Sequence, residues 1–327
     1  MMRVLFLVGL SLLFAGCSKV QFAYNQLDWL IPYYVDTQID LTGSQEDYLQ
    51  QRVDALLDWH CSTHLEAYAE LLRSANTDFQ NGTMSEQKLR HILSQVEMYW
   101  KEIKQQANPA IAYLLLNASD SQVDELFKSF TNKDIEWLEW FDALSDEELR
   151  LDYQKNMTRE LERWFGPLQA SQQRAVVEWS LSFVPLGMES YKARYRWHEN
   201  LRELMGQRDD VQAFNSGVEQ LLVNTERVYT SEYFRRVDHN TKISIELILF
   251  VGSKLDDSQR KHLASKVGSV SGDFDELACT DKNTEKQVRW ELRDTVSSNP
   301  HFSPGSREQA QDGARLSHQM DELSLDL

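Results

Sequence analysis

The feature that most constrains the fold of this chain is a helix-start signal that recurs along it. A Ser, Thr or Asp is followed three residues later by Gln or Glu, directly before a stretch with apolar residues at helical spacing. The small side chain caps a free backbone N–H at the helix start, and the later side chain reaches back to do the same. The pairs are Thr42 and Gln45, Thr83 and Glu86, Ser119 and Gln122, Ser145 and Glu148, and Asp256 and Gln259. Five such starts in one chain predict a helical architecture.

Scarce helix breakers support the same conclusion. The 327 residues include only 13 Gly and 6 Pro, fewer than chains built of turns and short strands carry. We therefore expect an all-α fold, a multi-helix bundle of long amphipathic helices. The expected helices cover 42–75, 84–107, 120–142, 145–164, 168–204, 208–230, 232–252 and 256–278.

Three places should break these helices. We expect Pro109 to interrupt or restart a helix, because proline removes a backbone donor. The pair at 166–167, Gly-Pro, should end one helix before the next begins, and 185–187 should kink or split a third. The run ISIELILFV at 243–251 fits a strand or a buried helix, and its helical surroundings favour the helix.

The N-terminus predicts export and lipid attachment. An apolar run from Val4 to Phe14 follows Arg3 and is too short to span a bilayer, but it fits a secretory signal. The sequence FAGC at 14–17 resembles the bacterial lipobox, although Phe14 stands where Leu is commoner. In a lipobox the cysteine, here Cys17, is diacylated and becomes the new N-terminus. The alternatives are an ordinary signal with a chance cysteine, or an uncleaved anchor.

The residue after the cysteine bears on location. In the common rule for Gram-negative lipoproteins, Asp there retains the protein at the inner membrane, whereas Ser18 points to the outer membrane, facing the periplasm. The expected organisation is a signal peptide at 1–16, an aromatic-rich strap at 17–40, a helical domain at 41–297 and a disordered, polar tail at 298–327.

The net charge limits which partners the chain can bind, and the cysteine content raises the question of a disulfide. The net charge of −17 argues against nucleic-acid binding and against electrostatic docking on anionic lipid, so lipid on Cys17 would supply the membrane attachment. The two other cysteines, Cys61 and Cys279, form an even pair in an oxidising compartment. Two interpretations remain open: the cysteines form a disulfide, or they are two unpaired buried thiols. Spacing in the sequence does not establish which cysteines are bonded.

The aromatic strap at 17–40 has two interpretations. It packs on the core of its own domain, which we favour, or it inserts into the membrane interface through Trp29, Tyr33 and Tyr34 as amphipathic anchors.

His60 and His64 lie four residues apart on one apolar helix face and are the candidate metal ligands. No HExxH or Glu-x-x-His pattern accompanies them, and no third ligand is nominated. We favour the alternative, a pair at the edge of the core, hydrogen-bonded to a carboxylate or carbonyl. GxSxG, P-loop and GxGxxG motifs are also missing from the sequence, so we expect no enzyme and no cofactor.

Several stretches resemble an uncharacterised family of proteobacterial lipoproteins, domain of unknown function 6279. They are GCSKVQFAYNQLDWL, VDTQIDLTGSQ, LLDWHCSTHLEAYAELL, ERWFGPLQASQQRAVVEW and LDDSQRKHL. The resemblance covers most of the mature chain and implies the compartment and a helical fold, but no activity.

A weaker likeness joins LTGSQ at 41–45 to the LTxxQ motif of small periplasmic stress chaperones, with approximate copies at 168–172 and 255–259. A leucine directly before a capping box gives the same pattern, so the requirements of helix capping alone can produce this motif.

The leading hypothesis is a non-enzymatic outer-membrane lipoprotein that binds a protein or another envelope component. A chaperone-like holdase is the alternative, and a metal-dependent enzyme using the two histidines comes third.

Overall fold

A computed structural model describes residues 19–279, and every regular element in that range is helical. The α-helices are α2 (Lys19–Tyr24), α3 (Leu27–Ile39), α4 (Gly43–Thr63), α5 (Leu65–Asn81), α6 (Glu86–Leu116), α7 (Asp120–Asp142), α8 (Asp146–Phe165), α9 (Ala170–Ser182), α10 (Gly187–Met205), α11 (Val211–Leu222), α12 (Ser231–Ser253) and α13 (Asp257–Leu277), with a 3₁₀ turn η1 (Thr225–Val228). The expected all-α fold is confirmed. The expected signal peptide at 1–16, Cys17, the last part of the expected domain and the expected tail at 298–327 lie outside the described residues.

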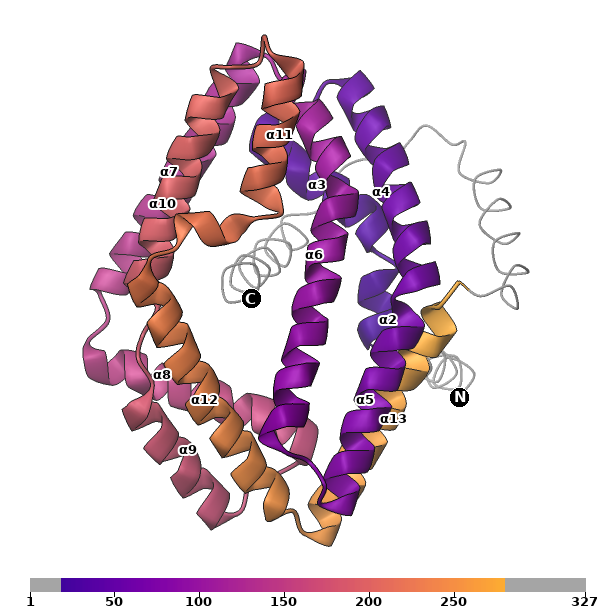
Figure 1. Cartoon of the computed structure of the whole chain (residues 1–327), viewed down its shortest axis with the longest axis vertical. Coiled ribbons are helices and arrows are strands. Elements are labelled where there is room, and N and C mark those ends of the chain that lie inside the picture. The colour runs from indigo at the N-terminus through magenta and orange to yellow at the C-terminus, as the bar shows by residue number, and fades with distance from the viewer. Residues whose placement is uncertain (1–18, 280–327) are drawn as a thin grey trace, which may run out of the picture.

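The helices are arranged as an elongated frame (Figure 1). In this view α4, α5 and α13 form the right side, α7 and α10 form the upper left side, and α8, α9 and α12 lie below α7 and α10. The long helix α6 runs down the middle, between the two sides.

Two hydrophobic clusters form the main core, and α6 connects them. The first joins α3, α4, α7, α10 and α11 to the C-terminal end of α6, with Phe214 and Val218 almost completely buried. The second joins α5, α8, α9, α12 and α13 to the N-terminal end of α6, around Val176 and Val251. Only the two ends of α6 therefore enter the core.

Most of the predicted helix starts are confirmed. Capping boxes begin α4, α7, α8 and α13 at Thr42, Ser119, Ser145 and Asp256. The expected start at Thr83 is wrong, because Ser85 caps α6 and accepts from the backbone N–H of Lys88 at 3.3 Å. Thr83 follows the left-handed Gly82 that ends α5, and its hydroxyl donates to Asp78 instead, at 2.7 Å.

Three expected helix limits are corrected. The helix expected at 208–230 ends at Leu222, and the 3₁₀ turn η1 follows it. The helix expected at 42–75 is divided at His64, which ends α4 and precedes α5. Pro109 does not interrupt α6, which continues to Leu116. Pro109 and Gln105, whose carbonyl loses its helical donor, are both exposed, so water can satisfy that carbonyl and the helix tolerates the proline.

The other expected breaks are present. Gly166 ends α8 with φ of 79°, a conformation that favours glycine, and a Cβ there would lie 3.1 Å from the ring of His262. Residues 183–186 separate α9 from α10, and the run 243–251 belongs to α12 as a helix. Within residues 19–279, no helix is both long enough and apolar enough to cross a bilayer.

Candidate functional site

The two predicted candidate histidines meet residues from three other helices at the break between α4 and α5. We call His60, His64, Tyr24, Tyr68 and Glu102 the junction cluster. Its members come from α2, α4, the α4–α5 break, α5 and α6, so one small region ties these helices together.

His60 is held between two tyrosines. Its Nδ1 lies 3.0 Å from the Tyr24 hydroxyl and its Nε2 lies 3.2 Å from the Tyr68 hydroxyl. Burial, with a smaller contribution from nearby His64, lowers the pKa of His60 to about 4. Burial also raises the pKa of Tyr24 to about 12, so this hydroxyl keeps its proton. A neutral imidazole has one donor and one acceptor, and the two hydroxyls can satisfy both.

His64 connects the junction to α6. Its side chain is buried, and its Nε2 lies 3.0 Å from Glu102 Oε2, at ion-pair distance although not aligned as a hydrogen bond. Its Nδ1 lies 2.7 Å from the Thr63 hydroxyl. The His60 and His64 rings stack, with centroids 5.3 Å apart.

The geometry gives these histidines partners other than a metal. Within residues 19–279, no group of three or more His, Cys, Asp or Glu side chains is placed to hold a metal ion. Both ring nitrogens of His60 face tyrosine hydroxyls, and Glu102 lies beside His64. The junction cluster is thus a set of hydrogen bonds around His60 with the His64–Glu102 contact beside it.

The remaining cysteines meet beside this network. The Sγ atoms of Cys61 and Cys279 form a disulfide bond 2.01 Å long, across a sequence separation of 218 residues. The backbone N–H of Cys279 also donates to the Cys61 carbonyl at 3.2 Å. Together these contacts fasten the end of α13 to the end of α4.

A second buried polar cluster was not predicted. Asp134 on α7 accepts from Arg194 Nε on α10 at 2.6 Å, and His198 Nδ1 lies 3.3 Å from its other oxygen. Burial raises the pKa of Asp134, but hydrogen bonds from His198 and Arg194 outweigh this effect and leave it below its ordinary value. The available signal was the spacing of Arg194 and His198, four residues apart on one helix face. The cluster holds α7 against α10.

The strap has two faces. Ile31, Val35 and Ile39 of α3 pack into the first hydrophobic cluster. Tyr34 accepts a hydrogen bond from Lys133 on α7 at 3.0 Å, so it faces the domain. Trp29 and Tyr33 are exposed, with ring centroids 6.4 Å apart.

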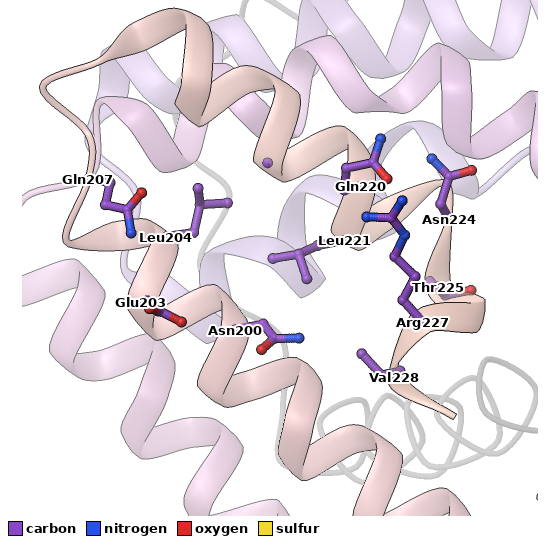
Figure 2. Close-up of a pocket in the computed structure, with 11 residues that line it drawn as sticks. Asn200, Glu203, Leu204, Gln207, Gln220, Leu221, Asn224, Thr225, Arg227 and Val228 are labelled. Atoms are coloured by element: carbon purple, nitrogen blue, oxygen red, sulfur yellow. The ribbon is translucent and has the colours of Figure 1, made fainter. Parts of the chain in front are cut away.

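A surface groove lies between α10, α11 and η1 (Figure 2). It has a volume of about 280 Å³. Among the described residues, the groove is lined by four carboxamide side chains, two charged side chains and three apolar side chains. The carboxamides are Asn200, Gln207, Gln220 and Asn224, the charged residues are Glu203 and Arg227, and the apolar residues are Leu204, Leu221 and Val228. Carboxamides both donate and accept hydrogen bonds, so the groove can take a small polar group.

The middle of α6 carries the most unusual surface of the described chain. No residue of α6 between Leu89 and Ala112 is buried. Leu93, Val96 and Trp100 lie on one helix face at i, i+3 and i+7, and each is about 40% exposed (43%, 38% and 40%). We call these three residues the α6 face. The sequence showed an amphipathic helix here, but could not show that Leu93, Val96 and Trp100 stay exposed.

The comparisons with known proteins identify the family. No curated protein and no solved structure matches the chain significantly. The model of DUF6279, a family of unknown function, matches residues 37–234. This range extends from the end of α3 to the start of α12, so it includes the junction histidines, α6 and the groove. The chain therefore belongs to the DUF6279 family of unknown function.

Proposed function

We propose that this protein is a non-enzymatic, lipid-anchored outer-membrane lipoprotein that faces the periplasm and binds a protein partner on the α6 face. The observation that supports binding is the uncovered centre of α6, where Leu93, Val96 and Trp100 remain accessible although the helix runs through the middle of the molecule.

An exposed apolar stripe is a candidate interaction site. Side chains at i, i+3 and i+7 lie on one side of a helix, and an amphipathic helix is bound by a partner through anchors with this spacing. Exposed Glu97 and Lys101 lie close to the stripe and supply charges of both signs for a polar rim. The occupant that fits is an amphipathic helical segment of a periplasmic or envelope protein.

The membrane part of the proposal rests on sequence. FAGC at 14–17 fits a lipobox, and α2 begins at Lys19, two residues after the candidate lipidated cysteine. Export would also place Cys61 and Cys279 in an oxidising compartment, where a disulfide is stable.

Site-specific photo-cross-linking in cells tests the binding surface. We expect a photo-reactive amino acid at Val96 to give one or a few discrete protein adducts, and L93E together with W100E to abolish them. Leu181 on α9, which is 64% exposed, provides the matched control position. The same adducts from both positions, or none from Val96, would contradict the proposal.

A holdase is the second candidate, and the α6 face is the observation that favours it, since an unfolded client also needs an accessible apolar surface. The glutamines of the LTxxQ-like segments do not supply that surface, because Gln45, Gln172 and Gln259 are buried. A holdase predicts that the purified protein suppresses aggregation of an unfolded client at near-stoichiometric ratio, and that L93E with W100E reduces this effect. Wild-type protein that leaves aggregation unchanged removes the candidate.

A further inference from the structure

We propose that the exposed aromatic side chains of the strap, Phe22 on α2 and Trp29 and Tyr33 on α3, lie in the interfacial region of the membrane beside the lipid on Cys17. The inference rests on the proposed lipid anchor and adds a second, non-covalent contact with the bilayer. It combines the two interpretations of the strap, because one side packs on the domain and the other side is left for lipid.

The first support is the composition of the exposed side. Phe22 is 65% exposed, Trp29 52% and Tyr33 53%. The other exposed residues between 20 and 39 are Ala23, Asn25 and Thr37. Charged residues make up 26% of the whole chain, yet none is exposed between 20 and 39, and the exposed Asp40 stands at the end of the strap, after α3. An aromatic surface without exposed charge over 20–39 suits the boundary between headgroups and acyl chains.

The second support is how the charged residues of the strap are used. Asp28 accepts from the backbone N–H of Trp29 at 2.9 Å, and Asp36 accepts from the backbone N–H of Leu41 at 2.8 Å. Both carboxylates are thus turned to nearby backbone and are only partly exposed. The outward side can approach lipid without desolvating a charge that lies on its surface.

The third support is rigidity. The inward residues of α3 belong to the first hydrophobic cluster, and Gln50 on α4 donates to the Asp28 carbonyl at 3.0 Å. On α2, the Tyr24 hydroxyl contacts His60 in the junction cluster. The exposed aromatic rings are therefore carried by helices already fixed to the domain, so little conformational freedom is lost when they contact lipid.

The fourth support is proximity to the lipid. Phe22 and Trp29 follow Cys17 by only 5 and 12 positions in the sequence. Twelve residues span at most about 43 Å even when fully extended, so Trp29 stays within reach of a bilayer that holds Cys17. A diacylated cysteine would itself hold the chain at the bilayer, so the tethered aromatic side chains would meet lipid at a high effective concentration and add a second contact.

Quenching by brominated lipid tests the placement of Trp29. The full-length lipidated protein is reconstituted into phosphatidylcholine vesicles whose acyl chains carry bromine near the headgroup. We expect the bromine to quench about one ninth of the total fluorescence if the nine tryptophans emit equally and Trp29 alone reaches lipid. W29F should lose this quenching. W140F, which replaces a tryptophan that is 49% exposed on α7, should retain it.

Flotation of the same vesicles separates failure of this inference from failure of the anchor. Protein that floats with vesicles and carries acyl groups on Cys17, but shows equal quenching in wild type and W29F, overturns the aromatic contact and leaves the anchor intact. Protein that carries no acyl group on Cys17 overturns both. A photo-reactive residue at Tyr33 should cross-link to lipid, and cross-links to a second copy of the chain instead would also overturn the inference.

Discussion

Gln45 and Gln122, which are 77 residues apart in sequence, exchange hydrogen bonds through their side-chain amides. Gln122 Nε2 donates to Gln45 Oε1 at 2.7 Å, and Gln45 Nε2 donates to Gln122 Oε1 at 3.3 Å. Each oxygen also accepts from the backbone N–H of its own capping residue, Thr42 or Ser119. Two helix starts, those of α4 and α7, are thereby joined face to face.

The same arrangement occurs at the other end of the molecule. Gln259 Nε2 donates to Gln172 Oε1 at 2.9 Å, Gln172 Nε2 donates back at 3.2 Å, and the pair joins the starts of α9 and α13. Gln172 belongs to a capping box with Gln169 that we did not predict, since Gln is an unusual cap. The LTxxQ-like segments therefore join helices in pairs, and their glutamines are not free to contact a client.

Loss of a paired glutamine should destabilise the fold. We expect Q172A to lower the free energy of unfolding by about 2–3 kcal/mol, because it leaves several buried groups without partners. Denaturant titration measures the change, and Q105A at an exposed position of α6 should stay within about 0.5 kcal/mol of wild type. The double variant Q172A with Q259A should cost less than the sum of its two singles, and strict additivity would contradict the pairing.

Acid should weaken the junction cluster through His60. The pKa of His60 is about 4 in the folded protein, against an ordinary value of 6.5, so the folded state disfavours the charged form. Its contribution to stability is complete above pH 6.5 and is lost as the pH falls toward 4. We expect the melting temperature of H60Q to fall less than that of wild type between these values, whereas H91Q, at an exposed histidine, should follow wild type. Parallel pH profiles for H60Q and wild type would be evidence against a buried neutral His60.

The disulfide should contribute strongly to stability. Bridging a separation of 218 residues is worth about 5 kcal/mol in the chain-entropy description. We expect a large loss of stability in C61S with C279S, measured by denaturant titration. Thiol titration of the unfolded protein should detect no free thiol at Cys61 or Cys279, and reactive thiols at both positions would refute the bond.

Two helical glycines should respond oppositely to alanine. A Cβ on buried Gly252 would come within 2.4 Å of the Phe79 ring, whereas nothing lies within 4 Å of a Cβ on exposed Gly268. We expect G252A to destabilise by about 1–3 kcal/mol through overpacking, and G268A to stabilise by about 0.5–1 kcal/mol through helix propensity. Thermal melting of the two variants checks both signs, and a stabilised G252A would show that the ring can move aside.

The amino-acid sequence by itself determined the helical class and most helix starts, because a capping box is a contact between residues three positions apart. Thr42, Ser119, Ser145 and Asp256 could be located for this reason. The error at Thr83 was also local, since the preceding Gly82 ends α5 in a left-handed conformation and moves the cap to Ser85.

Only the tertiary structure decided what these elements contact. His64 divides the predicted helix 42–75 where its buried ring meets Glu102 on α6, a residue that no local pattern connects to it. The pairing of Gln45 with Gln122 and the exposure of Trp100 likewise depend on which helices pack together and which do not. Helical periodicity defines an apolar side, but burial of that side requires a neighbour, and neighbours distant in sequence are set by the packing of the whole chain.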